Sequence, residues 1–300
     1  CIRLPHPDWA PSGAPRVGKK PSKVAIVGAN VSAANAIRTP QFWCLWVILF
    51  CNITAGIGIL ENAAPMVQDY FPSLSAAAAA GFVGLLSLAN MGGRFIWSSA
   101  SDVIGRKNIY MVYLGAGLIF YFLLASAGHT SLALFVVSAL ILLTFYGGGF
   151  ATIPAYLRDL FGVYQVGAIH GRLLTAWSAA GVAGPLIINM VVERQASRGH
   201  EGPQLYQLSL YIMCVLLAVG LVANVLVRPV DRKWFEDPAT VQAKVDADRV
   251  SAVGTQAASP ARSEGAAHAV AAAVLAAVIV ALLVYGLWET AVKASQMFAG

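Results

Sequence analysis

The chain has 300 residues, of which 58% are hydrophobic and only 11% are charged, and its mean hydropathy is +0.69. A soluble domain of this length could not bury so much apolar surface, so the composition excludes most soluble enzymes and indicates a membrane protein. The formal charge of +6 comes from Lys and Arg spread through short polar loops, without the basic stripe of nucleic-acid-binding proteins. We therefore expect no nucleic-acid partner.

The first 38 residues are polar, rich in proline and basic. We interpret residues 1–38 as a cytoplasmic segment cut from a longer chain. A lipid-carrying Cys1 is the alternative, but it would place Arg16, Lys19 and Lys20 outside the cell, against the preference of basic residues for the cytoplasmic side.

Six apolar stretches follow within residues 39–228, each long enough to cross ~30 Å of hydrocarbon as a helix. The first is opened by Thr39 as N-cap and Pro40 as first helical residue. The predicted spans are Gln41 to Glu61, Ala76 to Ser98, Asn108 to Ala127, Ser131 to Leu157, Val166 to Val192 and Leu205 to Val227. Residues 229–268 are predicted to form a flexible cytoplasmic linker, and residues 269–291 an additional transmembrane helix with its apolar part from Ala269 to Trp288.

The basic residues indicate the orientation. With the N-terminus in the cytoplasm, the cytoplasmic segments hold Arg38, Arg106, Lys107, Arg158, Arg172, Arg228, Arg232 and Lys233, among others, whereas the opposite side holds only Arg194, Arg198 and Lys293. We therefore expect an integral membrane protein, with the bacterial inner membrane as its location and the N-terminus inside.

The four cysteines include no Cys-x-x-Cys pair, and the five histidines are isolated along the chain. The sequence therefore predicts no disulfide framework, no metal site and no cofactor.

The turn between the second and third spans reads Ser101-Asp102-x-x-Gly105-Arg106-Lys107. Asp102 suits a helix end that pairs with basic groups, Gly105 permits a tight reversal, and the two basic residues hold the turn at the cytoplasmic face. This run resembles the signature cytoplasmic loop of major facilitator superfamily transporters, in the copy between their eighth and ninth helices. A generic positive-inside hairpin is the alternative; it explains Arg106 and Lys107 but not the spacing of all four residues.

Further motifs narrow the resemblance. Residues 147–162, 167–171 and 174–177, with Thr54-Ala55-Gly56 and Gly184-Pro185, are similar to the oxalate/formate antiporter family. The resemblance implies an all-α polytopic bundle in which residues 39–228 form the C-terminal six-helix half, built of two three-helix inverted repeats. It implies carriage of a small organic anion by alternating access, without enzymatic chemistry. The missing N-terminal half, or a second copy in a homodimeric half-size carrier, would complete the cavity; a non-transporting membrane sensor or scaffold is the other alternative.

Arg94 is the leading candidate for contact with the anion. It lies eight residues before Asp102, roughly 12 Å into the membrane, where an unpaired cation costs at least ~2.5 to 3.5 kcal/mol and is expected to meet an anion. The alternative is a partner carboxylate or carbonyl on another helix. The resemblance implies that an Arg in the eighth helix and a Lys in the eleventh bind oxalate, but Trp177 stands at the second position, and no Lys occurs between Lys107 and Lys233. We therefore expect a monocarboxylate such as formate, lactate or pyruvate.

Aromatic residues complete the predicted site. Tyr146 and Phe150, four residues apart, resemble the aromatic cage of the family, and Trp177 would form an apolar wall. Plain helix packing is the alternative for all three, and an interfacial position is another for Trp177. The glycines at 147–149, 181 and 184 suggest close helix contact. Glu61 and Asn62 are expected to close the first span near the outer face, as a gate or as solvated rim residues.

Overall fold

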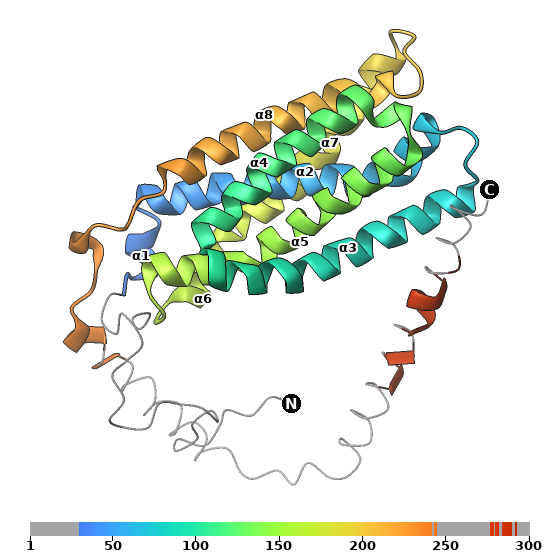
Figure 1. Cartoon of the computed structure of the whole chain (residues 1–300). Helices are drawn as coiled ribbons and strands as arrows, with labels where there is room; N and C mark the ends of the chain where they lie inside the picture. Colours follow the sequence, from blue (N-terminus) through green and yellow to red (C-terminus); the bar gives the residue numbers. More distant parts are fainter. Residues whose placement is uncertain are drawn as a thin grey trace.

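The computed structural model describes residues 30–241, 243–244, 277–278, 280–281, 284–289 and 292. In this part of the chain the backbone is mostly helical, with connecting loops and one isolated bridge between Val31 and Phe235. Six of its helical stretches are long and apolar enough to cross a membrane. They run alongside one another as one bundle (Figure 1). The predicted all-α bundle with six spans is confirmed.

The described helices are α1 (Ala33–Ala36), α2 (Pro40–Tyr70), α3 (Ala76–Ile104), α4 (Arg106–Ala127), α5 (Leu132–Phe161), α6 (Val166–Leu173), α7 (Thr175–Ala196) and α8 (Gln204–Leu226), with short 3-10 turns η1 (Gly128–Thr130) and η2 (Arg232–Trp234). Helices α6 and α7 form one membrane-length stretch. The N–H of Leu174 donates to the carbonyl of His170 at 2.9 Å, and the N–H of Ser178 donates to that of Leu174 at 3.1 Å. Helical hydrogen bonding therefore continues across Leu174, as the predicted single span requires.

The first span begins where the sequence predicts and ends later. Thr39 is the N-cap, its hydroxyl accepting from the N–H of Phe42 at 3.3 Å, and Pro40 is the first helical residue. The predicted end at Glu61 is wrong, because α2 continues to Tyr70 and so places Glu61 inside the helix. The last turns bury Met66, Val67 and Tyr70 in the core, and this packing supports helix well beyond the strongly apolar stretch.

Helix α3 packs most extensively against α5, α4 against α8, and α2 against both α7 and α8. Glycines make the first of these contacts very close. A Cβ placed on Gly147 would lie 2.0 Å from the carbonyl oxygen of Asn90, and one on Gly93 would lie 2.3 Å from that of Thr144. The predicted close contact at residues 147–149 is therefore present, since the two backbones meet where no side chain fits. Gly181, in contrast, has no neighbour within 4 Å of its Cβ position.

Segments before α2 and after α8 meet at the end of the bundle that carries the α3–α4 turn. The N–H of Val31 donates to the carbonyl of Phe161 at 2.9 Å, and the N–H of Glu236 donates to that of Asn30 at 2.8 Å. The side-chain oxygen of Asn30 accepts from the N–H of Val163 at 2.9 Å. The beginning of the predicted linker thus packs on the bundle.

Part of the predicted seventh helix is described. Residues 277–278, 280–281, 284–289 and 292 are helical, and nearly all of them are exposed. The remainder of residues 269–291, like residues 1–29, 242 and 245–268, lies outside the described residues.

Candidate functional site

Arg94 lies well inside α3, ten residues before its last residue, Ile104, or about 15 Å along the helix axis. Its Nε donates to the side-chain oxygen of Asn90 at 3.2 Å, and its guanidinium carbon lies 5.3 Å from the centre of the Phe150 ring. The side chain is exposed. Within the described chain, no carboxylate forms an ion pair with it. Both partners of this cation are uncharged, so its charge is not neutralised by them.

The three predicted aromatic residues lie around Arg94. The ring centres of Phe150 on α5 and Trp177 on α7 are 5.9 Å apart. Tyr146, one turn before Phe150, lies near the side chains of Trp177 and Arg94. The structure thus brings together four side chains from α3, α5 and α7. We call Arg94, Tyr146, Phe150 and Trp177 the Arg94 cluster.

The position of Tyr146 depends on a glycine of α2. A Cβ on Gly56 would lie 2.4 Å from Cδ2 of the Tyr146 ring, so any larger residue there would displace the ring. Glu61 is exposed on the same helix, on the side of Tyr146. The ring therefore lies between the packed core and the exposed face that carries the cluster.

The Arg94 cluster offers one guanidinium, one phenol and two apolar rings. This set suits a small anion that has a flat or apolar part, because the cation attracts the charge while the rings exclude water. Trp177 is 44% exposed, so the cluster is an open surface in the described chain. Among the described residues, no three His, Cys, Asp or Glu side chains are grouped to hold a metal ion.

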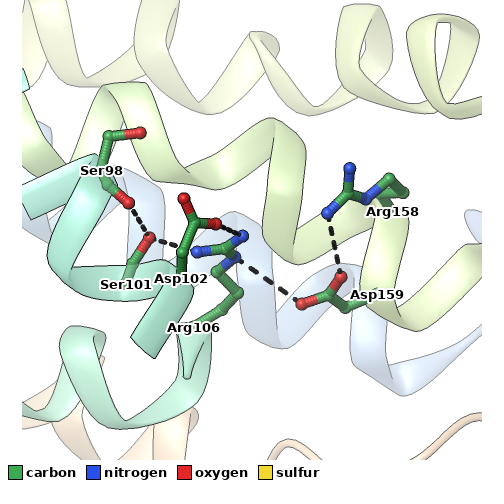
Figure 2. A network of polar contacts seen from close by, with 6 residues as sticks. All are labelled: Ser98, Ser101, Asp102, Arg106, Arg158 and Asp159. Atoms are coloured by element: carbon green, nitrogen blue, oxygen red, sulfur yellow. Dashed lines mark hydrogen bonds and ion pairs between the residues drawn. The ribbon is translucent and has the colours of Figure 1, made fainter. Parts of the chain in front are cut away.

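The α3–α4 turn contains Gly105 and Arg106, and Figure 2 shows Arg106 in contact with Asp102 and Asp159. Gly105 ends α3 and precedes α4 with φ 93°, a conformation that favours glycine. Arg106 donates to the hydroxyl of Ser101 and to the carboxylate of Asp102. Its Nε also lies 3.7 Å from a carboxylate oxygen of Asp159. Only 9% of the Arg106 side chain is exposed. Through its contact with Asp159, this buried cation connects the turn to the end of α5.

Lys107 reaches a different helix. Its ammonium donates to the carbonyls of Val225 at 3.0 Å and Val227 at 2.7 Å, where α8 ends. These carbonyls have no helical donor, and a positive charge at this end complements the helix dipole. The side-chain amide of Asn224 donates back to the carbonyl of Lys107 at 2.9 Å. The turn is thereby joined to α8. Helix α3 itself runs two residues past Asp102, which the sequence placed at the helix end.

Sequence reasoning missed three residues that support these groups: Asn90, Asp159 and Asn224. Asn90 stands one helical turn before Arg94, a spacing that places the two side chains on one face of α3. Asp159 was visible only as part of the Arg-Asp pair that ends α5. Asn224 carried no signal, since a single amide in an apolar helix does not reveal its partner.

Comparisons with known proteins agree with this geometry. The model of the Major Facilitator Superfamily matches residues 3–185 and 73–292. An oxalate:formate antiporter of Oxalobacter formigenes is 27% identical over 164 residues, which are 54% of this chain and 38% of that protein. The uncharacterized MFS-type transporter YhjX of Escherichia coli (strain K12) is 23% identical over 157 residues, which are 52% of this chain and 39% of that protein.

The matched region spans about two fifths of the length of these two relatives. The described chain has six membrane-length helices, and the turn between α3 and α4 carries the Ser101-to-Lys107 motif. The family model matches most of the chain. This integral membrane protein belongs to the Major Facilitator Superfamily of transporters.

Proposed function

We propose that this chain forms one half of a secondary transporter for a small organic anion, and that Arg94 contacts the anion. The observation that carries the proposal is the environment of Arg94: an exposed guanidinium inside a membrane span, held by Asn90 and the ring of Phe150 without an ion-pair partner among the described residues. A cation at this depth is stabilised when an anion or a water-filled cavity faces it.

We further propose that the anion carries a single negative charge, with formate, lactate and pyruvate as candidates. Trp177, which stands where the resemblance implies a second cation, lies against Phe150 instead. No lysine occurs between Lys107 and Lys233 that could replace it. The name of the Oxalobacter formigenes relative includes oxalate, a dianion, and formate, a monoanion. The single cation of the Arg94 cluster favours the monoanion.

The proposed orientation places the N-terminal side, the α3–α4 turn and the residues after α8 in the cytoplasm, in the inner membrane of a bacterium. Asp102, Gly105, Arg106 and Lys107 would then form a cytoplasmic gating network. Its contacts with α5 and α8 would transmit movement between helices at that face. The N-terminal half of a longer protein, or a second copy, would cover the exposed Arg94 cluster and complete the site.

Counterflow in proteoliposomes tests the proposal. Labelled formate, lactate and oxalate are compared for this chain and for the longest gene product that contains it. Transport by the longer protein alone supports the half-transporter; saturable transport by this chain indicates a homodimeric carrier, and transport by neither supports a sensor or scaffold.

Variants of the transporting form test the residues. We expect Arg94→Gln to weaken apparent affinity for the anion about 10- to 100-fold, the effect of losing one charged hydrogen bond, with Arg94→Lys less impaired. Arg198→Gln, on an exposed loop, is the control and should transport normally. Trp177→Lys adds a second cation and should raise the preference for oxalate over formate. Unchanged uptake by Arg94→Gln would contradict the role of Arg94.

A further inference from the structure

Three segments that are distant in sequence meet beside α6: the residues before α2, the α5–α6 turn and the residues after α8. Asn30 connects them. Its side-chain oxygen accepts from the N–H groups of Val163 at 2.9 Å and Tyr164 at 3.0 Å, and its carbonyl accepts from the N–H of Glu236 at 2.8 Å. Helix α1, which follows Asn30, lies next to α6 (Figure 1). One asparagine therefore joins the beginning and the end of the six-span unit to the turn between its fourth and fifth spans.

The neighbouring hydrogen bonds satisfy two helix ends. Phe161 is the last residue of α5, so its carbonyl has no donor within that helix; the N–H of Val31 donates to it at 2.9 Å. Ala33 is the first residue of α1, and its N–H donates to the side-chain oxygen of Gln165 at 2.6 Å. Each segment thus supplies the partner that a helix end of the other lacks. We call the following residues the Asn30 clasp: Asn30, Val31, Ala33, Phe161, Val163, Tyr164, Gln165 and Glu236.

Helix α6 buries little surface of its own. Of its eight residues, Ile169 and Leu173 are buried, and Val163 in the turn before it is 68% exposed. A helix of about two turns is not stable by itself, so α6 depends on the contacts at its ends. Water can replace the hydrogen bonds of groups as exposed as those in the turn. This part of the structure therefore has the features of a segment that opens locally while the long helices stay packed.

The position of the clasp relates it to the Arg94 cluster. The turn that the clasp holds joins α5, which carries Tyr146 and Phe150, to the α6–α7 span, which carries Trp177. Trp177 lies four residues, or about one helical turn, after Leu173 at the end of α6. A movement of α6 away from α5 would therefore widen the opening to the cluster at this end of the bundle.

We propose that the Asn30 clasp controls access to the Arg94 cluster from the end of the bundle that carries the α3–α4 turn, the proposed cytoplasmic face. The closed clasp holds α6 against α5 and restricts that opening. Release of the clasp lets α6 move aside, so that the anion reaches or leaves the cluster on this side. The inference rests on the proposed transport function, because it assigns the clasp to one of the two openings of that site.

Hydrogen exchange of the full chain in detergent measures release of the clasp. Asn30→Leu removes the acceptor of two N–H groups in the turn, so we expect Val163 and Tyr164 to exchange about tenfold faster than in the wild type. Asn30→Asp keeps an oxygen acceptor and should retain slow exchange. Asn35→Ala, a change in α1 of the same segment, is the control. Equal exchange in Asn30→Leu and Asn35→Ala would overturn the inference.

Labelling in proteoliposomes tests the effect on access, with the longest gene product that contains this chain. Trp177→Cys places a thiol in the cluster, and a membrane-impermeant maleimide is added at the face that carries the α3–α4 turn. We expect Asn30→Leu to raise the labelling rate about tenfold and Asn30→Asp to keep it slow; the chain without Trp177→Cys measures labelling of the native cysteines. A labelling rate unchanged by Asn30→Leu would also overturn the inference. Absence of counterflow in every form would instead contradict the proposed transport function, which exchange and labelling do not measure.

Discussion

Replacement of Gly147 by alanine should separate α3 from α5. The added Cβ would lie 2.0 Å from the carbonyl oxygen of Asn90 and 2.9 Å from its carbon. Because these are backbone atoms, they cannot rotate away, and the helices must move apart by about 1 Å to reach 3.0 Å, the lower limit of real Cβ contacts. Such overpacking costs about 3 kcal/mol, and the better helix propensity of alanine offsets about 1 kcal/mol.

The net loss of about 2 kcal/mol corresponds to a fall of about 4 to 8 °C in melting temperature for a domain of this size. The full chain is purified in one detergent, and unfolding is followed with a dye that reacts with newly exposed cysteine thiols. Gly115→Ala is the matched control, since the Cβ position of Gly115 on α4 has no neighbour within 4 Å. We expect this control to melt at the wild-type temperature or slightly above it. If Gly147→Ala melted with the control, the close α3–α5 contact would not exist as described.

Two further variants test the groups that hold the turn and Arg94. Lys107→Gln should lower the melting temperature by about 4 °C, because two carbonyls at the end of α8 lose a charged donor. Lys233→Gln is the control and should change the melting temperature little, since the side chains of its ion pair are 70% and 73% exposed. Equal shifts for the two variants would refute the capping role of Lys107. Asn90→Leu should weaken anion binding about tenfold in counterflow by releasing Arg94, without a comparable loss of stability. Asn62→Leu, which removes a bond only to Gly58 within α2, serves as its control, and equal affinities for the two variants would refute the positioning role.

The sequence predicted the membrane spans well because their signals are local. Apolar length marks each span, and Thr39 with Pro40 marks one helix start through hydrogen bonds of the next turn. The end of α2 was missed because it depends on distant contacts. Asp69 near that end accepts from the hydroxyl of Tyr206 on α8 at 2.7 Å, a pairing across 137 positions that no local pattern reveals.

The Arg94 cluster could be predicted only through the resemblance to a family. Arg94 and Trp177 are 83 positions apart, and their proximity arises from the packing of α3 and α7 around α5. The sequence alone indicated a membrane-buried cation and an aromatic pair at helical spacing, and such a pair is more often explained by plain helix packing. Asn90, which accepts a hydrogen bond from Arg94, was missed although its spacing of four residues places it on the same face of α3, because spacing alone does not show which neighbour a side chain bonds.

The glycine contacts also bear on how access to the proposed site would alternate. Gly147 and Gly93 bring α3 and α5 into backbone contact, and Gly184 places α7 against α2, with its Cβ position 2.9 Å from the carbonyl oxygen of Thr54. Independent sliding of one helix would bring backbone atoms of its neighbour into collision, because at these glycines the contacting atoms belong to the backbone and cannot rotate away. The same contacts fix Arg94 relative to Phe150. They therefore favour movement of this bundle as one body against the proposed other half, with the Arg94 cluster kept intact while the opening of the proposed site changes from one side of the membrane to the other.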